Sequence, residues 1–201
     1  MFIIYLFPVL LALGIGLIPF VSNYADPAAT DQAARETVRW FWGHILSGAA
    51  FGVSIIVARQ ISSLLAVKGA AKTGKLSFVL VTLGATAMAM GLGADGIGAA
   101  AMVAGNVSPN VFFEGSGFMV IGLIMTGIVL FSLGVINQII GLYRSEILTK
   151  RQGVVLTGCA VLIIGVSAVP STAGLYLLAV LVLIIYGVIG RSITSKGYGE
   201  R

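Results

Sequence analysis

The sequence predicts an all-α fold: a polytopic membrane protein in which residues 1–201 form one domain, a bundle of six transmembrane helices. Three observations predict it. Hydrophobic residues make up 58% of the chain and charged residues only 9%, whereas a typical soluble domain has about 45–50% and about 25%. Six apolar segments are close to the length of about 20 residues that crosses a hydrocarbon core. Basic residues alternate with these segments in a pattern that predicts an N-in, C-in topology.

Each apolar segment is predicted to be a helix because its apolar residues run without a break, as they do from Leu175 to Val188. Strands of a membrane barrel would instead alternate apolar and polar residues. In lipid, a continuous apolar segment pairs all of its backbone groups only when it is a helix. The six predicted spans are approximately 2–21, 38–58, 76–93, 117–142, 153–169 and 174–190.

The first span and the loop after it differ sharply in polarity. Met1 to Ile4 carry no charged side chain, and the apolar run is longer than the roughly 7–15 residues of a signal peptide, so we interpret 2–21 as a span. The polar segment 22–37 follows on the outer side. Residues 31–37 within it are predicted to form a short surface helix that leads into the span 38–58.

The segment 94–116 is too apolar for a free loop and too short to span. We expect the helix 76–93 to end at the glycines of the segment 91–96, and a small helix that lies on or dips into the outer face to follow. A re-entrant pore segment is the alternative. The segment 91–96 also matches the dinucleotide pattern G-x-G-x-x-G, but it follows no strand, so we interpret that match as false. Pro170 makes the last two spans a tight hairpin.

The charges differ between the two sides of the predicted bundle. All but two of the 12 lysine and arginine residues lie in the loops 59–75 and 143–152 or in the C-terminal segment. Because cytoplasmic loops are enriched in basic residues, these segments are predicted to be cytoplasmic, in a multi-pass protein of the plasma (inner) membrane. The other side holds Arg35 and Arg39 together with the acids Asp26, Asp31, Glu36, Asp95 and Glu114.

The composition excludes several kinds of chemistry. One cysteine, Cys159, allows no intrachain disulfide, and one histidine, His44, allows no histidine cluster for a zinc or di-iron site. Arg39 lies at the outer edge of the span 38–58, and the hydrocarbon core itself is predicted to contain no Asp, Glu, Lys or Arg, so a proton relay through it has no carriers. No acid is expected at the depth of His44, which leaves no Ser-His-Asp triad. We therefore expect no catalytic residues, no metal site and no enzyme activity.

His44 is the one residue that suggests a cofactor. It follows Trp40, Phe41 and Trp42 and lies a few residues inside the second span. A neutral imidazole can serve as an axial ligand to a haem or a chlorophyll-type pigment. The alternative is an interfacial residue within an aromatic belt, hydrogen-bonded to a neighbouring helix or to water.

Glycines within the spans favour close helix packing. Gly127, Gly134 and Gly141 recur at seven-residue spacing on the fourth span, and Gly48 and Gly52 are four residues apart on the second. Small residues let membrane helices approach each other closely. We expect these five glycines to be helix-packing positions.

Polar side chains within the fourth span raise a different interpretation. Thr126, Asn137 and Gln138 could bond across helices, or could line a site for a neutral solute together with Thr157. The second interpretation predicts a polar-lined cavity between the second, fourth and fifth spans.

Two segments are similar to patterns in small six-helix bacterial membrane proteins of unknown function. One is the segment Arg39-Trp40-Phe41-Trp42-Gly43-His44 after an outer loop rich in alanine and aspartate, and the other is 142–148 before a glycine- and leucine-rich hairpin. The resemblance implies the six-helix fold and carries no activity with it.

The leading functional prediction is a non-catalytic accessory or structural subunit that packs in the lipid bilayer against other membrane protein subunits and binds no nucleic acid. It depends on the absence of charges at membrane depth, the glycine faces and the polar tail 192–201. One alternative is a facilitator or binding protein for a small neutral or lipid-like molecule. The other is a haem or pigment carrier through His44.

Overall fold

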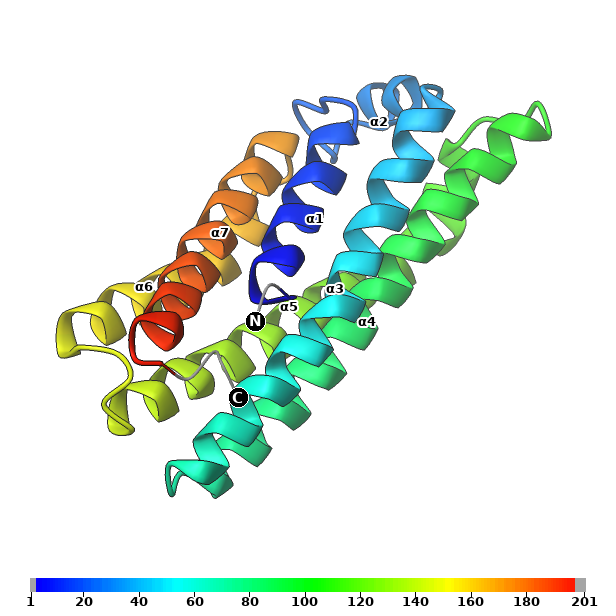
Figure 1. The fold of residues 1–201 in the computed structure, drawn as a ribbon. Coiled ribbons are helices and arrows are strands. Elements are labelled where there is room, and N and C mark those ends of the chain that lie inside the picture. Colours follow the sequence, from blue (N-terminus) through cyan, green and yellow to red (C-terminus); the bar gives the residue numbers. More distant parts are fainter. Residues whose placement is uncertain (1–2, 198–201) are drawn as a thin grey trace.

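The computed structural model describes residues 3–197, which form seven α-helices and, within that range, no strand. The all-α prediction is therefore confirmed for the described part of the chain. The helices are α1 (Ile3–Leu17), α2 (Pro27–Ala34), α3 (Thr37–Val67), α4 (Ala71–Ala104), α5 (Asn110–Arg144), α6 (Lys150–Ser167) and α7 (Thr172–Ser195) (Figure 1).

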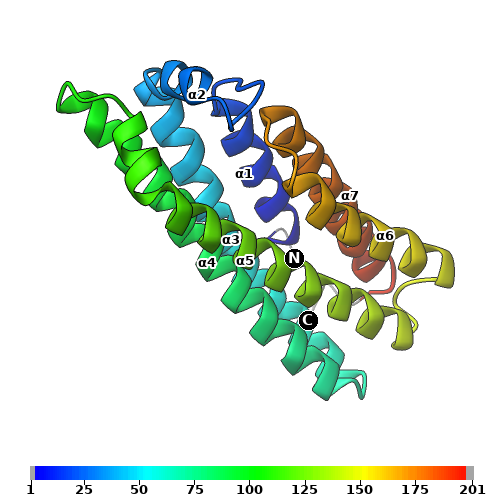
Figure 2. The same cartoon turned by 180° about the vertical axis from the view of Figure 1, so that it is seen from behind.

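Three long helices, α3, α4 and α5, lie side by side and make up the larger part of the bundle (Figures 1 and 2). Helix α1 packs against α3 on one side and against α7 on the other, and α6 packs against α5 and α7. The short helix α2 lies across one end of the bundle, where it contacts α3, α4 and α5. The α6–α7 hairpin therefore joins the long helices through α1 and through one end of α5.

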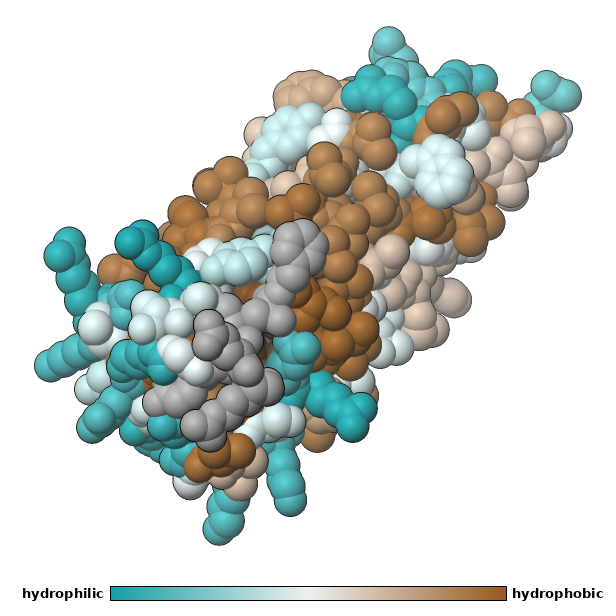
Figure 3. Space-filling model, in the orientation of Figure 1, coloured by the Kyte–Doolittle hydropathy of each residue, from teal (hydrophilic) through white to brown (hydrophobic). Residues whose placement is uncertain are grey.

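Five of the described helices, α3 to α7, are long and apolar enough to cross a membrane. Hydrophilic residues gather at the two ends of the molecule, with a hydrophobic band between them (Figure 3). Helix α1 is apolar as well, but its 15 residues extend only about 22 Å, less than the roughly 30 Å of a hydrocarbon core. The architecture agrees with a helical membrane protein, and the number of crossings beyond five stays a prediction.

Aromatic side chains fill the centre of the bundle. The ring of Phe7 from α1 lies 5.8 Å from that of Phe51 on α3, 5.7 Å from that of Phe131 on α5 and 5.0 Å from that of Tyr186 on α7. All four side chains are buried. Edge-to-face pairs at these distances stabilise a core beyond the area that they bury. This cluster connects α5 to α1 and α7, against which the α5 backbone does not pack directly.

Helices α3, α4 and α5 approach each other through glycines. A Cβ atom placed on Gly127 would come within 2.9 Å of the Gly84 carbonyl oxygen, and one on Gly134 would come within 2.7 Å of the Val81 nitrogen. Gly141 meets Leu65, and Gly48 meets the backbone of Ala89. By contrast, Gly52 is exposed and no described atom lies within 4 Å of its Cβ position, so it contacts no helix of this chain, and its role in helix packing stays a prediction.

The predicted end of the third span at the glycines is also wrong. Helix α4 continues through the segment 91–96 to Ala104, and α5 begins at Asn110, so no separate outer or re-entrant helix exists in 94–116. The glycines serve helix contacts instead. Gly91 faces Ile124 of α5, and Gly96 faces His44 of α3. The turn comes later, at Asn106, which has a positive φ of 56°.

The surface helix α2 begins earlier than the predicted 31–37. Asp26 accepts a hydrogen bond from the Ala28 nitrogen at 3.0 Å, and Pro27 occupies the first helical position. Both are favourable helix starts, so the helix runs from Pro27 to Ala34. The long helices likewise exceed their predicted spans, because hydropathy marks the apolar part of a helix and not the polar turns that continue it.

Candidate functional site

A cavity of about 650 Å³ lies between the long helices and the α6–α7 turn. Helix α5 packs against α6 at one end of the bundle and diverges from α1 and α7 toward the end that holds α2 (Figure 2). The cavity lies where they diverge. Its wall is mainly apolar, and its deeper part is formed by Leu11 and Ile15 of α1, Phe51 of α3, Met88 of α4, Val120, Ile124 and Ile128 of α5, and Leu175 and Leu178 of α7.

Polar side chains line the cavity toward the end of the bundle that holds α2, which is the outer end in the predicted topology. His44 and Ser47 come from α3, Asp95 from α4, and Asn110 and Glu114 from the first turns of α5. The loop before α2 adds Tyr24, and α2 itself adds Thr30. The wall is thus polar at this end, to which Ser167 and Ser171 of the α6–α7 turn also belong, and apolar along the rest.

His44 is held by two neighbours. Its Nδ1 lies 2.7 Å from the Trp40 carbonyl oxygen, one turn earlier in α3. Its Nε2 lies 3.4 Å from Asp95 Oδ2 on α4. The Trp40 ring covers it with centroids 4.6 Å apart, and only 4% of the residue is exposed. Both ring nitrogens are therefore directed at protein atoms.

Asp95 corrects the expectation that no acid lies at the depth of His44. Because α4 does not end at its glycines, Asp95 belongs to a helix that faces α3 and not to an outer loop. Gly96 makes the approach close, since a Cβ on that residue would lie 2.8 Å from His44 Cβ. The Trp40 indole also donates a hydrogen bond to the Asp95 carbonyl oxygen at 3.3 Å. The Asp95 side chain remains 19% exposed.

Three buried polar atoms at the cavity wall have no hydrogen-bond partner among the described residues. They are Ser47 Oγ, Asp95 Oδ1 and Asn110 Oδ1. Buried polar atoms in folded proteins nearly always have a partner, from the protein or from a bound molecule. Two of the three atoms can only accept a hydrogen bond, so the polar end is suited to a molecule that donates one.

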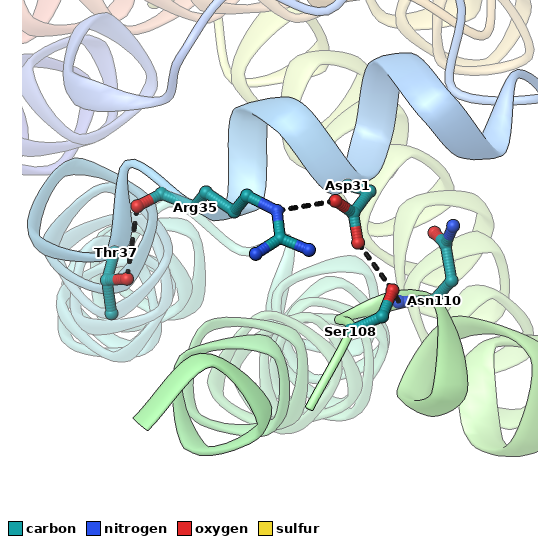
Figure 4. A network of polar contacts seen from close by, with 5 residues as sticks. All are labelled: Asp31, Arg35, Thr37, Ser108 and Asn110. Atoms are coloured by element: carbon teal, nitrogen blue, oxygen red, sulfur yellow. Dashed lines mark hydrogen bonds and ion pairs between the residues drawn. The ribbon is translucent and has the colours of Figure 1, made fainter. Parts of the chain in front are cut away.

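The outer end of the bundle is closed by a polar network (Figure 4). Asp31 of α2 accepts a hydrogen bond from Ser108 Oγ at 2.6 Å and one from Arg35 Nε at 2.7 Å. Ser108 Oγ in turn accepts from the backbone nitrogen of Asn110 at 3.2 Å. Thr37 Oγ1 donates to the Arg35 carbonyl oxygen at 3.3 Å. The network attaches α2 to the α4–α5 turn and to the start of α3.

A second set of bonds attaches the α1–α2 loop to the α6–α7 turn. Thr172 Oγ1 accepts from the Val21 nitrogen at 2.8 Å, and the Thr172 nitrogen donates to the Val21 carbonyl oxygen at 2.9 Å. The Tyr24 nitrogen donates to the Pro170 carbonyl oxygen at 2.7 Å. Burial raises the pKa of the Tyr24 phenol to about 12, so this group is neutral at physiological pH. The α1–α2 loop and α2, which cover the polar end of the cavity, are thus bonded to the α4–α5 turn on one side and to the α6–α7 turn on the other.

The polar residues predicted on α5 do not form a common site. Thr126 is exposed, and Asn137 is half-buried and donates to the Leu133 carbonyl oxygen at 3.0 Å. Gln138 is fully buried, with neither amide atom bonded among the described residues. None of the three lines the cavity described above, so the solute site predicted around them is a different location and stays a prediction. Asp95 and the polar ends of α2 and α5 were missed because they were assigned to loops.

A haem or pigment ligand role does not fit the surroundings of His44. An axial ligand needs a ring nitrogen directed at open space, and here Nε2 faces a carboxylate and Nδ1 a carbonyl oxygen.

No family model, curated protein or solved structure matches this chain.

Proposed function

We propose that this chain is a non-catalytic membrane protein that binds an amphiphilic, lipid-like molecule in the cavity between α1, α5 and the α6–α7 hairpin. The observation that carries the proposal is that the apolar and polar residues of the cavity wall are separated: the wall is apolar over most of its length, and polar groups gather at one end. An amphiphile has a matching shape, with an apolar chain and a polar head group. The volume of about 650 Å³ lies within the range of roughly 300–1,000 Å³ that small-molecule sites have.

The proposed route of entry is lateral, from the bilayer. The segment of α5 beside the cavity is not covered by another described helix on the side that faces away from the bundle. Its side chains there are highly exposed: Phe118 by 88%, Met119 by 72% and Ile121 by 61%. Ile121 also lines the cavity. A lipid-like molecule can therefore pass between α5 and the α6–α7 hairpin without leaving apolar surroundings.

The proposed topology has six crossings, with α1 as the sixth, in the plasma (inner) membrane. The α3–α4 turn, the α5–α6 loop and the end of α7 lie at one end of the molecule (Figure 1). These segments carry the basic residues, so we assign this end, the basic loops 59–75 and 143–152 and both termini to the cytoplasm. The polar end of the cavity then lies on the outer side.

An accessory-subunit role is the second candidate, and α6 supports it. Gly158 and Gly165 are exposed and have no atom within 4 Å of a Cβ position. A helix of another membrane protein could approach there closely.

The polar tail that suggested a partner extends into residues 198–201, which lie outside the described residues. Purification in mild detergent should give a stable hetero-complex, and a lone monomer would count against this role.

The binding proposal is tested with a brominated decanol in nanodiscs. Trp40 lines the cavity, whereas Trp42 is 55% exposed, so a Trp42→Phe background leaves one tryptophan as the reporter. Bromine at short range quenches tryptophan emission. We expect saturable quenching that Ile121→Phe weakens severalfold, because the larger ring partly fills the cavity.

The matched control is Met119→Phe, which adds a ring to the same exposed turn of α5 but does not line the cavity. It should leave the quenching unchanged. Quenching that rises linearly with the decanol content of the bilayer, equally in all three proteins, would contradict the proposal.

A further inference from the structure

The His44–Asp95 pair holds one proton between its two side chains. The Trp40 carbonyl oxygen can only accept a hydrogen bond, so His44 Nδ1, at 2.7 Å from it, carries a hydrogen. Nε2 then faces Asp95 Oδ2 at 3.4 Å. Two unprotonated acceptors would repel each other at this distance, so a second hydrogen lies on one of them. With that proton the pair is neutral in total, and without it the pair carries one negative charge.

The other ionisable groups around the cavity do not compensate that negative charge. Lysine and arginine are absent from its described wall, and the remaining ionisable side chains there are Tyr24 and Glu114. The Tyr24 phenol is neutral, and Glu114 is an exposed second carboxylate at the rim. Helices α1, α6 and α7 add no ionisable side chain to the wall. The nearby arginines of α2 and α3 are paired with Asp31 and Glu36 on the outer surface.

Aromatic rings surround the same polar end. Trp40, Phe112 and Phe113 line it, and the Trp40 and Phe113 rings lie 5.9 Å apart. The faces of aromatic rings attract cations, most strongly where water is excluded. Carboxylates and aromatic faces together favour a positively charged head group and disfavour an anionic one.

We propose that the occupant of the cavity is a lipophilic cation with N–H donors, such as a long-chain primary ammonium, and that its head group displaces the proton of the His44–Asp95 pair. Binding then exchanges one positive charge for another: the cation approaches Asp95, and the proton leaves to water. This inference rests on the proposed function, because it names the class of molecule for the same cavity.

The experiment compares three amphiphiles with the same brominated decyl chain and different head groups: a primary ammonium, an alcohol and a sulfate. Quenching of Trp40 is measured in Trp42→Phe protein in phosphatidylcholine nanodiscs, at equal concentrations in the bilayer. We expect the cation to bind at least about tenfold more tightly than the sulfate at pH 8. Its affinity should fall by up to about tenfold per pH unit where the pair holds its proton, while the affinity of the alcohol stays constant.

Asp95→Asn is the decisive variant, and Glu114→Gln is its matched control. Each substitution removes one carboxylate from the wall, but only Asp95 belongs to the pair. Asp95→Asn should abolish both the preference for the cation and its pH dependence, and should retain binding of the alcohol. Glu114→Gln should retain all three properties. If Asp95→Asn does not fold, His44→Gln replaces it and should remove the pH dependence above pH 5.

The outcomes separate the two proposals. Binding of the alcohol without a preference for the cation, or a preference without pH dependence, overturns the proton exchange and leaves the binding function in place. Absence of saturable binding for all three amphiphiles overturns the binding function itself. Preferential binding of the sulfate contradicts the charge argument directly.

Discussion

Asp31 is the residue that attaches α2 to the rest of the outer end. Its carboxylate receives hydrogen bonds from Ser108 and Arg35, and these two bonds, that from Ser108 first, lower the pKa of the carboxyl below its ordinary value of 3.8. The charged form is therefore favoured in the folded protein. Because Arg35 is largely exposed to water, we assign the Asp31 contacts only about 1 kcal/mol.

The pH dependence of this contact has a definite sign. The folded-state pKa of Asp31 is the lower one, so its stabilisation is present above about pH 4 and is lost as the pH falls through the folded-state pKa. We expect hydrogen exchange of the α2 amides, corrected for its intrinsic rate, to accelerate between pH 5 and pH 3 by about fivefold. Asp31→Asn should show the faster exchange at both pH values. Equal acceleration in both proteins would contradict this assignment.

Gly84 shows how closely α4 and α5 approach. A Cβ atom on it would come within 2.7 Å of the Gly127 carbonyl oxygen and of the Phe131 Cα, both backbone atoms that cannot rotate away. Gly84→Ala should therefore destabilise the protein by about 1–3 kcal/mol, in line with overpacked cores. Thermal unfolding in detergent measures the loss.

Gly122→Ala is the control for Gly84→Ala. Gly122 lies on α5, and no atom is within 4 Å of its Cβ position. Alanine there should be neutral or stabilise the helix by up to about 1 kcal/mol. Similar losses of stability in both variants would indicate that the α4–α5 approach is not as close as described.

At the scale of elements, the sequence predicts which segments are helices better than where they end. Apolar runs such as 174–190 correspond to described helices because lipid leaves a continuous apolar segment no other structure. Helix ends depend on packing. The glycines of 91–96 suggest a stop, but Gly91 and Gly96 are occupied by contacts with α5 and α3. Asp95 was placed in a loop for the same reason, and so its contact with His44 could not be predicted.

The hairpin turn before α7 holds the α1–α2 loop over the cavity. Thr172 is fully buried, and its Oγ1 accepts the hydrogen bond of the Val21 nitrogen at 2.8 Å. Thr172→Val keeps the shape and leaves this N–H without a partner, which should cost about 1–3 kcal/mol. We expect faster hydrogen exchange in residues 19–26 and unchanged exchange in α4.

Thr126→Val is the matched control for Thr172→Val, because Thr126 is an exposed threonine on α5 with no hydrogen bond to that loop. It should leave exchange in residues 19–26 as it is. An increase confined to α7 in Thr172→Val would mean that the loop is held by other contacts, such as that of the Tyr24 nitrogen with the Pro170 carbonyl oxygen.

At the scale of the whole molecule, the three long helices exceed what a bilayer needs. With 31, 34 and 35 residues, they are about 46–52 Å long against a hydrocarbon core of roughly 30 Å. They must tilt or project into water. Their length agrees with the two hydrophilic ends of the molecule (Figure 3). One end holds the polar network of α2 and the α4–α5 turn, and the other holds the basic turns. Both ends would project beyond the hydrocarbon core of a bilayer. In the proposed topology, the cavity would therefore extend from the outer aqueous face toward mid-membrane depth.

The orientation of the bundle in the membrane is tested by cysteine labelling in intact cells. The chain has one cysteine, so Cys159→Ser gives a background without thiols. Cysteines introduced by Lys72→Cys and Lys150→Cys should resist a membrane-impermeant maleimide, whereas one introduced by Asn106→Cys, at the α4–α5 turn, should react. Labelling of Lys72→Cys and Lys150→Cys alone would invert the topology and place the polar end of the cavity in the cytoplasm. Labelling of only one of the two would contradict the bundle itself, because both turns lie at the same end of it (Figure 1).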